Sequence, residues 1–329
     1  MKRQRKLSVI KLAIAIAAVA CLGAGAAATK QHLTKRLKHS QSAESYHRAF
    51  GRAYFPNAEL TTHKGEKVRF FEDVIEGKVV LINFIFTSCK ASCPLETARI
   101  RKVYDLLRDR MGKDVFFYSI SVDPKHDTPE VLDSYHERFK LGEGWTFLTA
   151  DQETVTLVQK KLGLFVDDVS KDSKDDHSLN LIVGNQATGK WIKRSHLENP
   201  QILATILQQL HQEQTEPLAL QSYSKAPVKV TEVSPGEKLF YSRCADCHTI
   251  GHGDTIGPDL INVSKVRRKD WLQRWIKEPD AMIVERDPIA IDLLARYNNI
   301  LMPNLRLSDD DANQVIDFID KESASLIKK

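Results

Sequence analysis

Residues 78–94 read Lys-Val-Val-Leu-Ile-Asn-Phe-Ile-Phe-Thr-Ser-Cys-Lys-Ala-Ser-Cys-Pro, and this stretch decides the fold of the first two thirds of the chain. Its first nine residues, 78–86, form a near-continuous apolar run, which is typical of a strand buried on both faces of a sheet. Pro94 suits the first turn of a helix, where its missing N–H would have no partner anyway. Cys89 and Cys93 therefore lie between a buried strand and the start of a helix.

The flanking sequence alternates between strand and helix patterns. Thr128 and Pro129 predict a helix start, with the threonine as N-cap. The other expected elements are a hairpin within 60–71, a helix after Pro94 with Val103, Leu106, Leu107 and Met111 on its apolar face, strands at 115–122 and 146–150, a helix at 152–162, a hairpin of 178–183 with 190–193, and a helix at 203–210. This order is typical of a thioredoxin-like α/β domain, which we predict for residues 40–213.

The rest of the chain divides into a linker and a helical domain. Residues 214–230 contain two prolines and no periodicity, so we interpret them as a linker. Helices are expected at 235–245, 268–278, 288–296 and 308–326. We therefore predict an all-α domain over residues 231–329.

The N-terminal segment, residues 1–39, has the pattern of a membrane anchor or an export signal. It holds nine Lys or Arg and no Asp or Glu, and residues 12–28 carry no charge. We favour a single uncleaved anchor, with a lipoprotein at Cys21 or a cleaved signal as alternatives. The rest of the chain has 39 basic and 43 acidic residues. The net charge of +5 thus belongs to this segment and gives no reason to expect nucleic-acid binding.

Residues 244–248 read Cys-Ala-Asp-Cys-His, a motif that attaches c-type haem. The thiols of Cys244 and Cys247 add to the haem vinyl groups, and His248 is placed to ligate the iron. Met302, which precedes a proline, offers a thioether for the opposite side. A zinc site is the alternative for such a cysteine spacing. Because c-type haem is attached outside the cytoplasm, the motif predicts that the chain faces the periplasm, on that side of the inner membrane.

The surroundings of this motif favour haem. The flanking pieces are Gly236-Glu-Lys-Leu-Phe240, Gly257-Pro258-Asp259-Leu260 and Leu301-Met302-Pro303-Asn304-Leu305. With them, residues 231–327 resemble a class I cytochrome c domain. The resemblance implies one covalent haem c with His248 and Met302 as axial ligands, and with the Pro258 carbonyl holding the other ring nitrogen of the histidine. Met282 lacks the following proline.

The cysteine loop supports two kinds of chemistry. A helix N-terminus favours the thiolate, which helps both dithiol exchange and metal binding. Three residues separate Cys89 from Cys93, and this wider loop lets both sulfurs approach one ion. Soft thiolates select copper or zinc, and two cysteines with one histidine form a known copper site. His177 is the best-placed third ligand, and a solvated loop histidine is the alternative.

Residues 55–212 resemble the Sco/SenC family of copper-handling proteins. The matching pieces are Asn83-Phe-Ile-Phe-Thr-Ser-Cys89, Cys93-Pro94, Ser119-Ile-Ser-Val-Asp123-Pro124, Asp127-Thr128-Pro129 and Asp176-His177-Ser178. The resemblance implies one copper per chain, Cu(I) or Cu(II), bound by Cys89, Cys93 and His177. Many members have proline after the first cysteine, where this chain has Lys90, and we expect its charge to stabilise the thiolates.

Four further side chains near these motifs receive weaker assignments. Asp123 falls at the strand-end acid of the family and is expected to help shape the copper site, with capping of the following turn as the alternative. His126, His136 and His196 are expected to be surface residues.

The two resemblances together predict a membrane-tethered periplasmic copper chaperone or thiol reductase fused to a cytochrome c. The implied partner is the oxidase subunit that carries the dinuclear copper centre, alongside other periplasmic cytochromes or copper chaperones. The haem is expected to exchange single electrons with copper or to feed the oxidase. One alternative is a disulfide reductase in which Cys89 and Cys93 cycle without stable copper. The other is a plain electron-transfer protein whose α/β domain only docks the haem to an oxidase.

Overall fold

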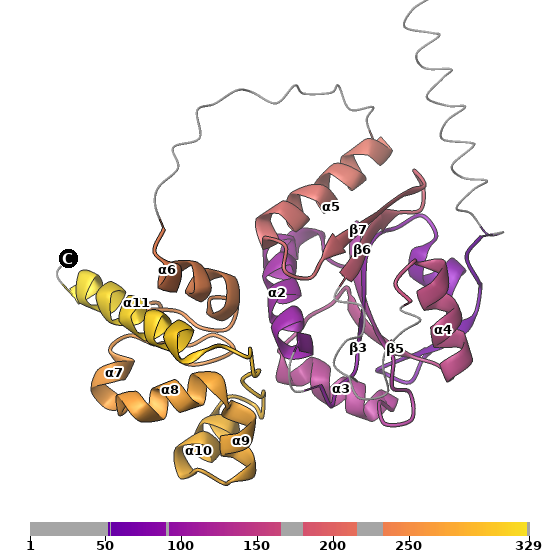
Figure 1. Ribbon diagram of the computed structural model, residues 1–329. Coiled ribbons are helices and arrows are strands. Elements are labelled where there is room, and N and C mark those ends of the chain that lie inside the picture. Colours follow the sequence, from indigo (N-terminus) through magenta and orange to yellow (C-terminus); the bar gives the residue numbers. More distant parts are fainter. Residues whose placement is uncertain (1–51, 53, 90–91, 166–179, 216–232, 328–329) are drawn as a thin grey trace, which may run out of the picture.

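The computed structural model describes residues 52, 54–89, 92–165, 180–215 and 233–327. These residues form an α/β domain and a helical domain that lie side by side (Figure 1). The predicted anchor, most of the predicted linker, Lys90 and His177 lie outside the described residues. Within the described part of the chain, no helix is long and apolar enough to cross a membrane.

A seven-stranded sheet organises the α/β domain. Its strands are β1 (Glu59–Thr62), β2 (Lys67–Arg69), β3 (Val79–Ile85), β4 (Val115–Ser121), β5 (Trp145–Thr149), β6 (Asn180–Asn185) and β7 (Lys190–Ser195). The strand order is β2-β1-β5-β4-β3-β6-β7. The three central strands β5, β4 and β3 are parallel, and an antiparallel hairpin extends the sheet at each edge. The predicted strands and hairpins are confirmed.

Four helices cover this sheet: α2 (Ser92–Leu106), α3 (Pro129–Arg138), α4 (Gln152–Lys161) and α5 (Pro200–Thr215). Two short helices, the π-helix η1 (Phe70–Ile75) and the 3-10 helix η2 (Arg108–Arg110), were not predicted. The N-cap prediction is confirmed, because the Thr128 hydroxyl accepts a hydrogen bond from the Val131 N–H. One predicted core position is wrong: Leu106 is exposed, since it projects from the side of α2 opposite to Tyr104, which packs in the core.

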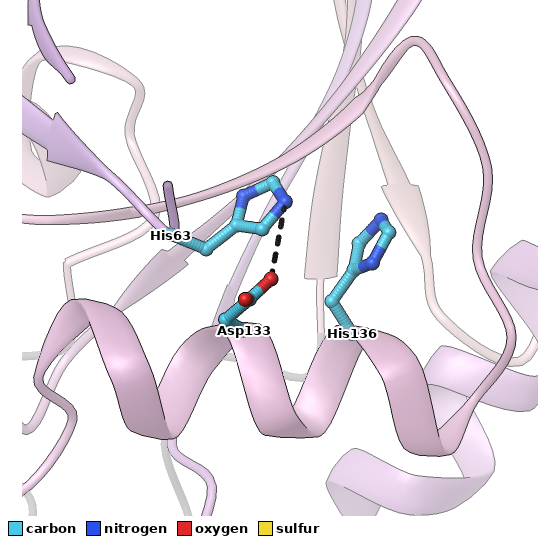
Figure 2. Close-up of side chains that lie close together, drawn as sticks. All are labelled: His63, Asp133 and His136. Atoms are coloured by element: carbon cyan, nitrogen blue, oxygen red, sulfur yellow. Dashed lines mark ion pairs between the residues drawn. The ribbon is translucent and has the colours of Figure 1, made fainter. Parts of the chain in front are cut away.

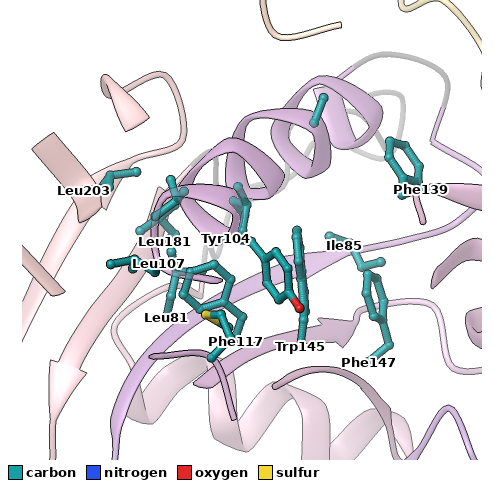
Figure 3. Packing of buried hydrophobic residues seen from close by; sticks show 14 of the residues in the cluster. Leu81, Ile85, Tyr104, Leu107, Phe117, Phe139, Trp145, Phe147, Leu181 and Leu203 are labelled. Atoms are coloured by element: carbon teal, nitrogen blue, oxygen red, sulfur yellow. The ribbon is translucent and has the colours of Figure 1, made fainter. Parts of the chain in front are cut away.

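The side chains of β3 enter two separate cores, as predicted for a strand buried on both faces. The first core packs under α2, α3 and α5, and the second packs under α4 and η1. Figure 3 shows the first core, in which Tyr104, Phe117, Trp145 and Phe147 pack their rings together. Each fully buried side chain of this size stabilises the fold by about 1.5–3 kcal/mol. The first core receives Val79, Leu81 and Ile85, and the second receives Val80, Ile82 and Phe84.

The helical domain consists of α6 (Pro235–Leu239), η3 (Phe240–Cys244), α7 (Val263–Val266), α8 (Lys269–Lys277), α9 (Pro279–Val284), α10 (Pro288–Arg296) and α11 (Asp309–Ile327). The long α11 packs against α6 and α8. Gly236 allows the close approach of α6, because a Cβ there would lie 2.0 Å from the Gln314 carbonyl oxygen. Phe240, Val315 and Phe318 fill the core between these helices. The sequence predicted the longer helices and missed α7 and α9.

Candidate copper site and haem pocket

Cys89 and Cys93 lie at one corner of the α/β domain, where the chain passes from β3 into α2. Both side chains are buried. The Cys93 N–H donates a hydrogen bond to the Cys89 sulfur at 3.4 Å, and the Ser92 hydroxyl oxygen lies 3.9 Å from the same sulfur. The described cysteines form no disulfide. Two neighbouring thiols in a water-poor corner are a fitting donor pair for a soft metal ion.

The protonation of Cys93 differs from the prediction. Hydrogen bonding to Cys89 raises the pKa of the Cys93 thiol well above its ordinary value, and burial raises it further. We predicted that the helix N-terminus would favour the thiolate, and for Cys93 this prediction is wrong. A second sulfur and the loss of water outweigh the helix dipole here. A metal ion that binds Cys93 must therefore displace its proton.

A buried carboxylate, Asp127, ties the cysteine loop to the end of β4. It accepts hydrogen bonds from the Thr87 N–H at 3.1 Å, from the Thr87 hydroxyl, and from the Ser121 hydroxyl at 2.6 Å. Asp123, which we predicted in this role, instead pairs with the exposed His126 at 2.8 Å. Asp123 therefore fits the alternative role, a contact within the turn that follows it, better than the predicted role at the copper site. The sequence feature that could have identified Asp127 is its position directly before the helix start at Thr128-Pro129.

A second buried acid, Glu96, was missed by the sequence reading. It is 2% exposed, and burial raises its pKa to about 8. The nearby Asn83 side chain opposes this shift, while the closeness of Cys89 adds to it. Asn83 accepts a hydrogen bond from Ser119 at 2.7 Å, and Ser119 accepts one from Trp145 at 3.0 Å. A polar chain thus runs through the core from the central strands toward the cysteine pair.

A cluster of two histidines and one aspartate lies at a different place in the α/β domain (Figure 2). His63 follows β1, whereas Asp133 and His136 lie on α3, and their ligand atoms lie within 4.8 Å of one another. The His63 Nδ1 accepts a hydrogen bond from the Phe147 N–H at 3.2 Å, so Nε2 carries the proton and has no lone pair for a metal. Lys64 already pairs with Asp133 at 2.5 Å. The cluster is therefore a structural polar contact.

Of the three histidines predicted at the surface, one is exposed, one is partly buried and one is buried. His126 is exposed, as predicted. His136 stacks on His63 with ring centroids 4.6 Å apart, and burial lowers its pKa to about 4. His196 is buried. Histidine carries an apolar ring, and sequence spacing alone did not show that α3 turns His136 toward the sheet.

The haem motif borders an apolar cavity of about 310 Å³ in the helical domain. Cys244, Cys247 and His248 line it from one side. The His248 Nδ1 lies 2.9 Å from the Pro258 carbonyl oxygen, which fixes the ring and leaves Nε2 for a metal. Gly257 is needed beside this ring, since a Cβ there would lie 2.5 Å from the His248 Cε1. These residues fit a covalent haem c.

The two methionines considered as haem ligands have different surroundings. Met302 lines the cavity that His248 also lines. Met282 is buried and is not among the residues that line this cavity. This placement fits the predicted choice of Met302, and iron ligation itself stays a prediction.

The cysteine corner and the haem cavity adjoin each other. Pro94, the residue after Cys93, lines the haem cavity. The apolar core that contains Cys89 and Cys93 also contains Ile256 of the helical domain, and Cys247 packs against it. The sequence reading did not predict this contact.

Comparison with known proteins identifies both parts of the chain. The SCO1/SenC family profile matches residues 47–212, and the cytochrome c profile matches residues 233–323. The chain belongs to the SCO1/SenC family. A SCO2-like protein of Rickettsia prowazekii is 32% identical over 145 residues, which span 43% of this chain and 68% of the relative. A Stutzerimonas stutzeri protein described as copper-binding is 28% identical over 149 residues, or 44% of this chain and 69% of the relative.

Two solved structures of the family are similar to part of this chain. A family lipoprotein from Bacillus anthracis gives a TM-score of 0.42 at 25% identity, covering 47% of this chain and 94% of that one. ScoI of Bradyrhizobium japonicum with copper bound gives a TM-score of 0.39 at 23% identity, covering 46% of this chain and 96% of that one. Each comparison covers less than half of this chain.

Proposed function

We propose that this chain binds one copper ion through Cys89, Cys93 and His177 and serves the assembly of the dinuclear copper centre of a haem-copper oxidase. The observation that carries the proposal is the pair of buried neighbouring thiols at the β3–α2 corner. Membership of the SCO1/SenC family and the likeness to a protein described as copper-binding support it. His177 lies outside the described residues, so its role rests on its sequence context.

The proposed location is the periplasmic side of the inner membrane, with an N-terminal anchor. The haem motif supports this location, because covalent haem attachment takes place outside the cytoplasm. The anchor is proposed from the sequence of residues 1–39. The proposed partners are the oxidase subunit with the dinuclear copper centre and other periplasmic cytochromes or copper chaperones.

We further propose that one haem c, held by Cys244, Cys247, His248 and Met302, exchanges single electrons with the copper site. A bound haem carries one electron at a time. Loss of one electron from Cu(I), giving Cu(II), balances gain of one electron by ferric iron. Oxidation of a dithiol to a disulfide instead releases two electrons and two protons, and one haem would accept the two electrons only in two separate steps. The electron count therefore favours copper as the redox partner.

The decisive experiment is a competitive Cu(I) titration of the reduced protein and two histidine variants. His177→Ala should lower the affinity at least about tenfold, since even the loss of a group that only supports a ligand costs 10- to 100-fold. His126→Ala is the matched control, because that side chain is exposed and pairs with Asp123. Equal affinity of His177→Ala and wild type would overturn the three-ligand site.

A second candidate function is reduction of a disulfide in the oxidase subunit. The nearness of the Cys89 and Cys93 sulfurs favours it, because the pair has the arrangement that a dithiol needs. Dithiol exchange does not need a histidine ligand. An exchange rate with a disulfide substrate that is unchanged in His177→Ala, together with absent copper, would favour this function over the first.

A further inference from the structure

A buried ion pair joins the α/β domain to the haem motif. Arg99 on α2 donates from Nε to an Asp246 carboxylate oxygen at 2.6 Å, and the two side chains are 5% and 6% exposed. Arg99 also donates to the Ser242 carbonyl at 2.8 Å. Lys102, one turn along α2, lies 3.4 Å from Asp246 and donates to the Ala245 carbonyl. The contact therefore joins two cations of one domain to one carboxylate and two carbonyls of the other.

This contact has the character of a specific interface. An exposed ion pair contributes little to the free energy of association, whereas a buried charge without its partner is strongly destabilising. Arg99 donates hydrogen bonds to Asp246 and to Ser242, and both of these acceptors belong to the helical domain. The two charges are thus matched only while the domains are in contact. A further hydrogen bond, from the Asn298 amide to the Arg138 carbonyl at 3.4 Å, joins the domains near the end of α3.

The interface lies at the edge of the haem site that carries the covalent bonds. Asp246 stands between Cys244 and Cys247 in the sequence, so thioethers formed there lie beside the ion pair. On the other side, Pro94 lines the haem cavity and directly follows Cys93. An apolar core continues across the boundary, because Ile256 is buried in the cluster that contains both cysteines of the copper site. Figure 1 shows α2 on the side of the α/β domain that faces the helical domain.

We propose that the face of α2 formed by Pro94, Arg99 and Lys102 is a docking site for the cytochrome c domain of the same chain, and that the Asp246 ion pair sets the thioether edge of the haem beside the cysteine pair. Arg99 and Asp246 are positioning residues in this proposal. The benefit of docking for electron exchange rests on the proposed function. The docking itself requires neither copper nor His177.

The test uses the full-length haem protein, metal-free at the cysteine pair and with both thiols reduced. Ferric low-spin haem is paramagnetic and ferrous low-spin haem is not, so the ferric-minus-ferrous shift of each α2 amide signal reports the nearness of the haem. Wild type should show such shifts along α2. Asp246→Arg and Arg99→Asp should each abolish them, because an unmatched charge lowers the docking equilibrium by about 100-fold or more. The double variant R99D/D246R should restore them.

The matched control is Arg101→Asp, the same substitution on the same helix at a residue that pairs with Asp105. It should leave the α2 shifts as in wild type. The visible spectrum of each variant shows whether the haem domain has folded, and if Asp246→Arg fails to fold, Arg99→Asp still decides. Absent shifts in wild type, equal loss with Arg101→Asp, or failure of the double variant would overturn the proposal. Shifts that vanish on dilution would also overturn it, since they would show docking between copies.

The same variants separate docking from electron exchange. In Cu(I)-loaded ferric protein, wild type should reduce its own haem at a rate independent of protein concentration, and Arg99→Asp should slow this reaction at least about tenfold. If the α2 shifts appear in wild type but no such reduction occurs, docking stands and the proposed electron exchange fails. If Cu(I) reduces the haem at the same rate in all variants, the ion pair does not position the haem for this electron transfer.

Discussion

Replacement of Glu96 by glutamine should make the stability of the α/β domain less sensitive to pH. Glu96 is buried beside the cysteine pair, and burial raises its pKa to about 8. Below the ordinary glutamate pKa, both folded and unfolded states hold the proton. As the pH rises toward 8, the unfolded state ionises while the folded state does not, so the wild type loses stability. Above pH 8 this loss is complete.

The size of this effect follows from the two pKa values. The difference between an ordinary glutamate and a pKa of about 8 corresponds to about 5 kcal/mol in total. About 3–4 kcal/mol of this loss falls between pH 5 and pH 8. Glu96→Gln keeps the shape of the side chain and cannot ionise. The free energy of unfolding of the variant, relative to wild type, should therefore increase by about 3–4 kcal/mol over this range.

The assay is amide hydrogen exchange at the central residues of β3 and β4, measured at several pH values in metal-free, reduced protein. Exchange at these buried strands reports the opening of the α/β core without interference from the helical domain. Glu143→Gln is the control, because Glu143 is exposed and its substitution should change the opening free energy by less than about 0.5 kcal/mol at every pH. A constant difference between Glu96→Gln and wild type from pH 5 to 8 would refute the reasoning.

Three further outcomes are expected. Asp127→Asn should destabilise the α/β domain by about 1.5–3 kcal/mol and weaken Cu(I) binding, because the amide replaces a charged acceptor of three hydrogen bonds; the same loss with Asp123→Asn would contradict this. Met302→Ala should abolish the near-infrared band of methionine-ligated ferric haem. Loss of this band in Met282→Ala instead would show that Met302 is not the ligand. Burial lowers the pKa of His136 to about 4, so wild type should lose stability as the pH falls from about 6.5 toward 4. Urea unfolding of His136→Gln should show a flatter acid limb than wild type, and an unchanged limb would rule out this cause.

The sequence predicted most of the architecture because its strongest signals are local. The apolar run of β3, the cap at Thr128 and the haem motif each act over a few residues, and the structure places the first two as predicted. The resemblance to a class I cytochrome c domain implied that His248 would contact the Pro258 carbonyl, and this contact is present. Patterns of this kind depend on backbone geometry that neighbouring residues set by themselves.

The errors concern side chains whose surroundings come from distant parts of the chain. Asp123 and Asp127 are four residues apart, and only the position of Thr87, in the loop that follows β3, decides which acid reaches the cysteine loop. The pKa of Cys93 depends on how closely Cys89 approaches and how little water enters. Glu96 has no local sequence signal of burial, and it is buried because α2 packs over the sheet beside Asn83. Long-range packing supplies all of this information.

The domain contact was the least predictable feature, and the burial of Arg99 explains why it matters. On a helical projection, Arg99 lies about 20° from Leu106, which remains exposed, and about 100° from Ile100, which faces the core. An arginine at such a position is expected to reach solvent in an isolated α/β domain. It is buried here because Asp246 and Ser242 cover it. Because Asp246 occupies one of the two unspecified positions of the proposed haem motif, a carboxylate there would not interfere with haem attachment, and it provides the partner that Arg99 needs.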